Sequence, residues 1–201
     1  FDVIPLGQAI TADFQRHPIV AAVMGGQLSR AQYARYIIDV YHYARHSAVV
    51  IGQAGVRLVH SHPALAAYFL RHAHEELGHD AWAHSDMIEM EYYFACNGNP
   101  VGLFGWTYVL ECLGGGMGGA MAAGIDRALR LNGKGVWFLS GHGDADSQHM
   151  VDLAQIINAH VAAAEDRACF LAVVDRARGL YRGILDAALA AGTDTLAVAA
   201  E

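Results

Sequence analysis

Helix-forming residues at helical spacing occupy nearly the whole chain, and no alternating apolar and polar run bounded by turn residues is present. Ala, Leu, Arg, Gln and Met recur in these stretches and favour helix. The pattern predicts helices over about 5–24, 29–61, 63–93, 101–131, 144–160 and 163–189. Only short turn sequences separate them, without a linker or a long repeat. We therefore expect residues 1–201 to form a single all-α domain, a bundle of six or seven helices.

The charge balance argues against one class of partner. Acidic residues outnumber basic residues by 20 to 13, which gives a net charge of −7. Binding to the phosphates of nucleic acid needs clustered Lys and Arg, so we do not expect nucleic acid as a partner. The three cysteines, Cys96, Cys112 and Cys169, have no close spacing, as is typical of a reduced chain in the cytoplasm. A mean hydropathy of +0.23 favours a homodimer that buries a helical face.

One long stretch carries almost no charge. Between Glu91 and Asp126 the only charged residue is Glu111. The stretch is long enough to span a bilayer, but it begins with a turn, contains a glycine-rich break and places a carboxylate near its middle. We expect a helix at the centre of a soluble bundle, without membrane association. A buried carboxylate needs compensation, and a bound cation would supply it.

Histidine is unusually frequent, at 12 of 201 residues, and its spacing indicates a metal site. His142, Asp146 and His149 stand at positions i, i+4 and i+7. At about 100° per residue these three side chains lie on one face of a helix and converge. Imidazole and carboxylate are ligands of iron, manganese and zinc.

A second stretch repeats this spacing. His72, Glu76 and His79 also stand at i, i+4 and i+7, and Glu75 lies one position to the side. Two such faces packed around Glu111 would hold one or two ions. For His72 an ordinary buried histidine is an equal alternative, and Glu75 is as consistent with an ion pair to an arginine.

The predicted ligands are three carboxylates and three histidines: Glu76, His79, Glu111, His142, Asp146 and His149. A ferritin-like carboxylate site would need one more glutamate, and residues 1–74 contain none. His142 is instead an additional histidine one turn before Asp146. We expect no catalytic residue beyond the metal ligands.

This arrangement resembles the haem-oxygenase-like dimetal oxidases and oxygenases, iron-containing redox enzymes that share a fold with haem oxygenase, thiaminase II and PQQ-synthesis protein C. The resemblance rests on Gln-Leu-Ser-Arg-Ala-Gln-Tyr at 27–33, Tyr-His-Tyr at 41–43, Glu-Glu-Leu-Gly-His at 75–79, Gly-Trp-Thr-Tyr-Val-Leu-Glu at 105–111 and His-x3-Asp-x2-His at 142–149. It implies a haem-oxygenase-like fold and a non-haem iron site, with manganese or zinc as alternatives. It further implies a small-molecule substrate, such as an amino acid or amine, which is oxidised with dioxygen.

The same resemblance implies how the ligands divide. Glu76, His79 and His142 would complete one iron site, and Glu111, Asp146 and His149 would contribute to the second.

Glycines near these ligands allow two interpretations. The glycine-rich stretch 114–119 would leave room above the metal for a small substrate. Possible walls of this space are Phe104, Trp106, Tyr108 and Met117, with ordinary core packing as the alternative. Gly141 and Gly143 flank His142, where they either loosen the helix until metal binds or allow close helix packing.

Three other functions fit parts of the sequence. A metal-free enzyme similar to thiaminase II would use a nucleophilic cysteine, and Cys112 is a candidate. A haem-binding or haem-degrading protein would need a proximal histidine near the start of the chain, where His17 stands. A metal-storage or structural bundle would bind iron without consuming oxygen.

Overall fold

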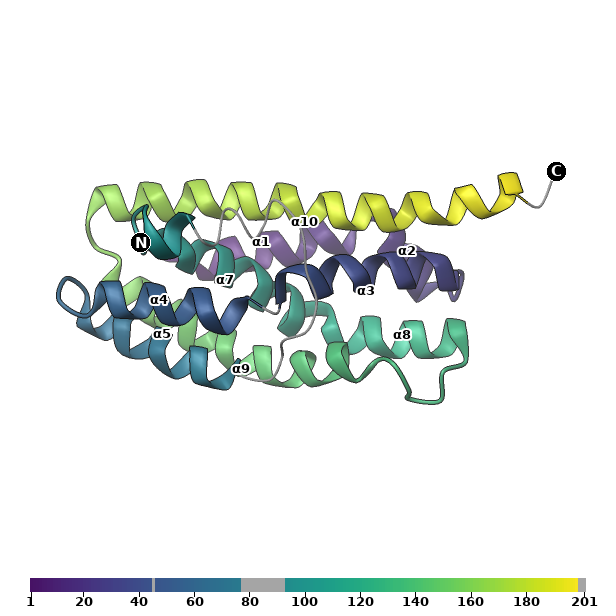
Figure 1. The fold of residues 1–201 in the computed structure, drawn as a ribbon, viewed down its shortest axis with the longest axis horizontal. Coiled ribbons are helices and arrows are strands. Elements are labelled where there is room, and N and C mark those ends of the chain that lie inside the picture. Colours follow the sequence, from purple (N-terminus) through teal and green to yellow (C-terminus); the bar gives the residue numbers. More distant parts are fainter. Residues whose placement is uncertain (45, 77–92, 199–201) are drawn as a thin grey trace.

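The computed structural model describes residues 1–44, 46–76 and 93–198 (Figure 1). Nine α-helices lie wholly within these residues, together with one π-helical segment and no strand, which confirms the all-α class. The elements are α1 (Ile4–Gln15), α2 (Pro18–Met24), α3 (Arg30–Ala44), α4 (Ser47–Leu58), α5 (Pro63–Glu75), α7 (Gly102–Leu113), η1 (Gly114–Gly118), α8 (Gly119–Leu129), α9 (Trp137–His160) and α10 (Ala164–Val198).

Some predicted helices are divided into shorter ones. The helix expected over 5–24 is divided because Pro18 lacks a backbone N–H and therefore begins α2 rather than continuing α1. His17 caps this new start, with its Nδ1 accepting a hydrogen bond from the Ile19 N–H at 3.3 Å. The helix expected over 29–61 is likewise divided between α3 and α4. Conversely, α9 begins at Trp137, seven residues before the expected start at Asp144.

The low-charge stretch forms the centre of the fold. Every residue of α7 except Leu110 is buried, and Figure 1 shows this helix between α10 and α9. A Cβ atom at Gly105 would lie 2.5 Å from the Phe170 carbonyl oxygen of α10, so this glycine permits the close approach of the two helices. Among the described residues, no helix combines the length and the hydropathy needed to cross a bilayer.

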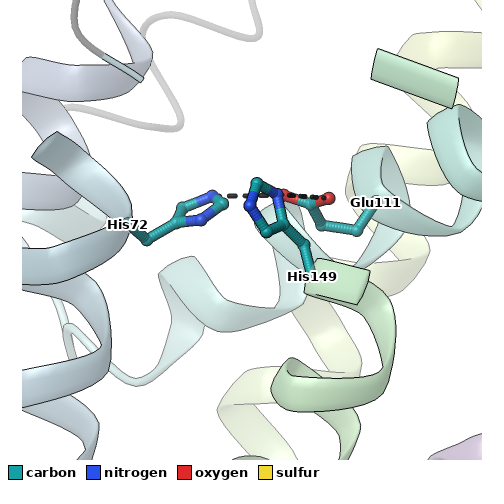
Figure 2. Close-up of side chains that lie close together, drawn as sticks. All are labelled: His72, Glu111 and His149. Carbon is teal, nitrogen blue, oxygen red and sulfur yellow. Dashed lines mark ion pairs between the residues drawn. The ribbon is translucent and has the colours of Figure 1, made fainter. Parts of the chain in front are cut away.

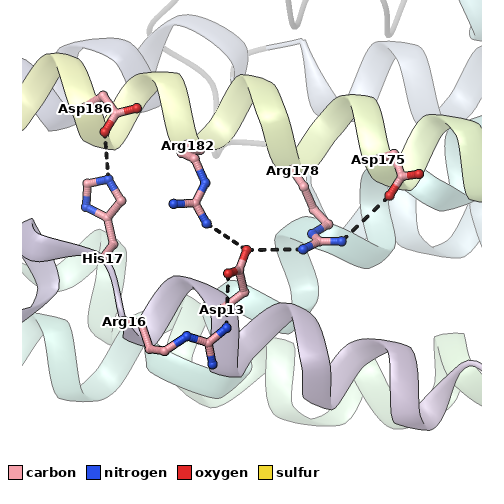
Figure 3. Close-up of polar contacts among 7 residues, drawn as sticks. All are labelled: Asp13, Arg16, His17, Asp175, Arg178, Arg182 and Asp186. Atoms are coloured by element: carbon pink, nitrogen blue, oxygen red, sulfur yellow. Dashed lines mark hydrogen bonds and ion pairs between the residues drawn. The ribbon is translucent and has the colours of Figure 1, made fainter.

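Polar contacts join α1 and α2 to the long helix α10 (Figure 3). Asp13 Oδ2 accepts hydrogen bonds from Arg178 at 3.1 Å and Arg182 at 2.7 Å, and His17 Nε2 lies 3.0 Å from Asp186 Oδ1. The Arg182 hydrogen bond lowers the pKa of Asp13 against the opposing effect of burial, and Arg178 lowers it further. Since these side chains are partly exposed, the contacts orient the helices more than they stabilise them.

Candidate metal centre

One carboxylate and two imidazoles from three helices meet inside the bundle (Figure 2). His72 Nε2 of α5 lies 3.1 Å from Glu111 Oε1 of α7. On the other side of this carboxylate, His149 Nδ1 of α9 lies 3.4 Å from Glu111 Oε2. One ligand atom from each of the three residues lies within 4.8 Å of the others, a separation suited to a shared cation.

Three further carboxylates surround this group. Glu75 Oε2 lies 3.5 Å from His149 Nε2, and Glu76 Oε1 lies 3.9 Å from His72 Nε2. Asp146 Oδ1 lies 3.9 Å from His149 Nδ1. Four acids around two imidazoles leave an excess of negative charge, which a divalent cation would neutralise.

The pKa shifts reflect this crowding. Burial favours the neutral form of Glu111, but the imidazoles of His149 and His72 outweigh it and lower the pKa of the carboxyl. Glu111 in turn raises the pKa of His149. Burial raises the pKa of Asp146 to about 10, helped by the negative charges of Glu111 and Glu76. Asp146 therefore holds a proton at neutral pH unless a cation takes its place.

Several buried ligand atoms have no hydrogen-bond partner within the described part of the chain. They are His72 Nδ1, Glu111 Oε2 and His149 Nδ1. The last two lie 3.4 Å apart, close enough for an ion pair but without the geometry of a hydrogen bond. Native proteins pair nearly all buried polar atoms, so three orphaned atoms in one cluster require an explanation. Their donor types match those of iron, manganese or zinc, so the residues present fit a metal ion.

Glycines bring α9 against the π-helical segment η1. A Cβ atom at Gly114 would lie 1.6 Å from Asp146 Oδ2, and one at Gly143 would lie 2.5 Å from the backbone nitrogen of Gly119. Only glycine permits these contacts. At Gly114 the Asp146 carboxylate takes the place that a side chain would fill, while Gly114 and Gly118 both line the cavity beside the ligands. Gly143 serves close helix packing, whereas a Cβ at Gly141 would meet nothing within 4 Å.

A cavity of about 80 Å³ lies beside the cluster. Its lining includes five of the titratable residues discussed above: His72, Glu76, Glu111, His142 and Asp146. His142 Nδ1 donates to the Phe138 carbonyl oxygen at 2.8 Å, because a carbonyl only accepts. This bond leaves Nε2 as the basic nitrogen, as in many metal-binding histidines.

The predicted ligands thus have different positions in the structure. Glu111 and His149 belong to the central group, while Glu76, His142 and Asp146 line the adjoining cavity. His79 lies outside the described residues. The sequence left the role of His72 open, although its i, i+4, i+7 spacing to Glu76 and His79 was the signal for it.

Of the four proposed substrate walls, only Trp106 lines this cavity. Phe104 stacks on Phe69 with ring centroids 3.7 Å apart, and the Tyr108 hydroxyl donates to the Val3 carbonyl oxygen. These two aromatic rings are core residues. Met117, which is also buried, is not among the cavity residues.

The surroundings of Cys112 and His17 do not favour the roles that the alternative functions need. Cys112 is fully buried, and burial raises the pKa of its thiol to about 12, which disfavours a nucleophilic thiolate. His17 lies close to Asp186 through one ring nitrogen and accepts from Ile19 through the other. A haem iron would have to displace one of these contacts.

A comparison with solved structures supports the fold. The chain is similar to a crystal structure of a domain of unknown function with a haem oxygenase-like fold from Shewanella denitrificans OS217, at a TM-score of 0.80 and 22% sequence identity. The match covers 94% of this chain and 92% of that one. Comparisons with protein-family models and with curated proteins give no match. The chain therefore has a haem oxygenase-like fold.

Proposed function

We propose that the protein is a non-haem iron-dependent oxidase or oxygenase that uses dioxygen to oxidise a small molecule, such as an amino acid or amine. The observation that carries this proposal is the meeting of His72, Glu111 and His149 beside a cavity lined by further carboxylates. The haem oxygenase-like fold supports the proposal, because this fold includes enzymes.

The ligand positions suggest how one or two ions would be held. His72, Glu111 and His149 would hold the first ion, with Glu75 beside the two imidazoles. Glu76, His142 and Asp146, which line the cavity, would contribute to a second. We keep His79 as a proposed ligand, on its sequence spacing alone.

Ferrous iron at this site would supply the electrons that dioxygen needs in order to react with an amine or a C–H bond. Asp146 holds a proton beside the cavity when no cation is bound, because burial and the negative charges of Glu111 and Glu76 raise its pKa to about 10. Aromatic and aliphatic side chains complete the lining of the cavity and keep bulk water away from the substrate. The aromatic ones include Tyr36, Tyr43, Trp106 and Tyr181.

Oxygen uptake by the ferrous protein tests this proposal. The wild-type protein, loaded anaerobically with ferrous iron, is expected to consume oxygen in an electrode chamber. Glu111→Gln keeps the size of the side chain but removes the charge between the two imidazoles, so it should bind iron at least about tenfold more weakly. Glu165→Gln, an exposed glutamate in α10, is the matched control and should behave as wild type.

The outcomes separate the remaining functions. Iron binding without oxygen uptake would indicate a storage or structural protein. Failure to bind iron, manganese or zinc would overturn the proposal altogether. Repeated turnover with a reductant and a panel of amino acids and amines, followed by mass spectrometry of the products, would identify the substrate class.

A homodimer and a cytoplasmic location are part of the same proposal. Exposed apolar residues follow one face around α4, namely Val49, Val56 and Val59, and a second copy would cover them. Sedimentation analysis measures the oligomeric state directly.

A further inference from the structure

The indole N–H of Trp106 is buried without a hydrogen-bond partner within the described part of the chain. The residue is only 1% exposed. A buried indole N–H usually finds an acceptor, and leaving it unpaired is unfavourable. The orphaned donor therefore indicates a missing acceptor.

Trp106 belongs to the wall of the metal cavity. It lies on the face of α7 that also presents Thr107, Leu110 and Glu111 to the cavity. The Tyr43 ring stands perpendicular to the indole, with ring centroids 6.3 Å apart. A ligand in the cavity would thus lie beside both Trp106 and the carboxylates that line it.

Two of the phenols that line the cavity with Trp106 are uncharged. The hydroxyls of Tyr36 and Tyr181 form a hydrogen bond of 2.8 Å with each other. Burial raises the pKa of both phenols well above the usual value, so they stay protonated. Among the described residues that line the cavity there is no Arg or Lys, whereas three are acids.

These surroundings select the chemistry of the acceptor. In the metal-free protein a carboxylate placed beside Trp106 would be buried near three acids and no Arg or Lys, which is unfavourable. An ammonium group has no lone pair to accept from the indole N–H. A neutral carbonyl or amide oxygen has a lone pair to accept the hydrogen bond and carries no charge to bury.

We propose that Trp106 donates its indole N–H to an uncharged carbonyl or amide oxygen of the substrate and so holds the oxidisable part of that molecule toward the metal ligands. This narrows the amino acids and amines of the proposed function to derivatives that carry such an oxygen. That the bound molecule is a substrate rests on the proposed function. The acceptor subsite itself rests on the cavity and the orphaned donor.

The volume of the cavity sets the size of the probe. A single buried water needs roughly 10–15 Å³ of such space, so about 80 Å³ admits only a small molecule. N-methylacetamide is a suitable neutral probe. Propionate and n-propylammonium have a similar size and carry one negative and one positive charge.

Nuclear magnetic resonance of the metal-free protein tests the subsite. With labelled tryptophan, the chain gives three indole N–H resonances, from Trp82, Trp106 and Trp137. Loss of one resonance in Trp106→Phe assigns the signal. Trp137→Phe, which removes an exposed indole, is the matched control. If Trp106→Phe does not fold, single Phe variants of the other two tryptophans assign the signal by elimination.

N-methylacetamide should shift the Trp106 resonance downfield in a saturable way, and the two charged probes should not. Trp106→Phe should weaken N-methylacetamide binding roughly three- to tenfold, as expected for one neutral hydrogen bond, and Trp137→Phe should leave it unchanged. A Trp106 signal that ignores all three probes, or that responds equally to propionate, would overturn the proposal.

The binding of N-methylacetamide is measured without metal, so its outcome does not depend on whether the protein is an iron-dependent oxidase or oxygenase. Zinc titration of Trp106→Phe gives a separate reading, since Trp106 is not a metal ligand and zinc affinity should remain that of wild type. Loss of zinc binding in this variant would show a structural role instead.

Discussion

Asp146 Oδ2 lies where a side chain at Gly114 would stand, since a Cβ atom at position 114 would be only 1.6 Å from it. Asp146 is 5% exposed, and Gly114 is the first residue of the π-helical segment that follows α7. Single-turn π segments inside helices are frequent at functional sites. Here the missing Cβ admits a carboxylate from α9 to the metal cavity.

Gly114→Ala should displace Asp146 from the cavity. The added methyl group collides with the carboxylate and its Cβ, so overpacking should lower the free energy of unfolding by about 1–3 kcal/mol. Iron or zinc affinity should fall at least about tenfold if Asp146 is a ligand. Isothermal titration and urea unfolding measure the two effects.

Gly141→Ala is the control for this substitution. Gly141 lies on the same helix as Asp146, and its added Cβ meets nothing within 4 Å. Alanine favours helix over glycine, so this variant should be more stable by about 0.5–1 kcal/mol. If Gly141→Ala also lost metal affinity, flexibility at this point of α9 would be required for binding.

Asp146→Asn should stabilise the metal-free protein while weakening its metal binding. The pKa of Asp146 is raised to about 10 in the fold, above the value of about 3.9 in an unfolded chain. The stability contributed by the protonated acid is therefore present below about pH 4 and is lost as the pH rises toward 10. Asparagine cannot ionise. At pH 8 in the presence of a chelator, the free energy of unfolding of the variant should therefore exceed that of wild type by at least about 1 kcal/mol.

Urea titrations at pH 4 and pH 8 measure whether the stability difference between the variant and wild type grows as the pH rises. Zinc should stabilise wild type more than the variant, which keeps the His72, Glu111 and His149 group but loses the Asp146 carboxylate. A metal-free variant less stable than wild type at both pH values would show that Asp146 has a structural role.

His72→Ala should reduce bound iron. The imidazole lies between Glu111 and Glu75 and is 2% exposed, so removing it deletes a ligand of the central group. We expect a loss of affinity of at least about tenfold by elemental analysis after dialysis. His160→Ala, at the exposed end of α9, should retain the wild-type content. Full occupancy in His72→Ala would assign the first ion to other residues, with His79 the next to test.

Asp13→Asn should weaken the contact between α1 and α10 (Figure 3). The pKa of Asp13 is lowered by Arg182 and Arg178, so its contribution to stability is present above about pH 4 and disappears as the pH falls through the lowered value. At pH 7 the variant should lose about 0.5–1 kcal/mol, and less at high salt.

Asp175→Asn serves as the comparison. Asp175 contacts Arg178 only at 3.7 Å and is 80% exposed, so its removal should have almost no effect. Equal losses in both variants would point to overall charge rather than the specific contacts of Asp13.

Much of this protein follows from local properties of its sequence. Helical spacing predicts the all-α class, and about 100° per residue places Asp146 and His149 on one face of α9 without reference to the rest of the chain. The isolated charge of Glu111 in an apolar helix predicts a compensating partner by solvation alone. The haem oxygenase-like fold was implied by the resemblance to a known family, and the structural comparison confirms it.

Only the tertiary structure decided which of these side chains meet. His72 joins Glu111 because α5 packs beside α7 and α9 at a particular distance and rotation, which depend on every residue between the helices rather than on spacing within one. The sequence predicts room beside the glycines of η1, but only the packing of α9 shows that Asp146 takes the place of a side chain at Gly114 while Gly114 and Gly118 line the cavity. The unpaired N–H of Trp106 is likewise visible only in the structure. The sequence shows that a donor is present, but only the packing shows that no described residue accepts its hydrogen bond.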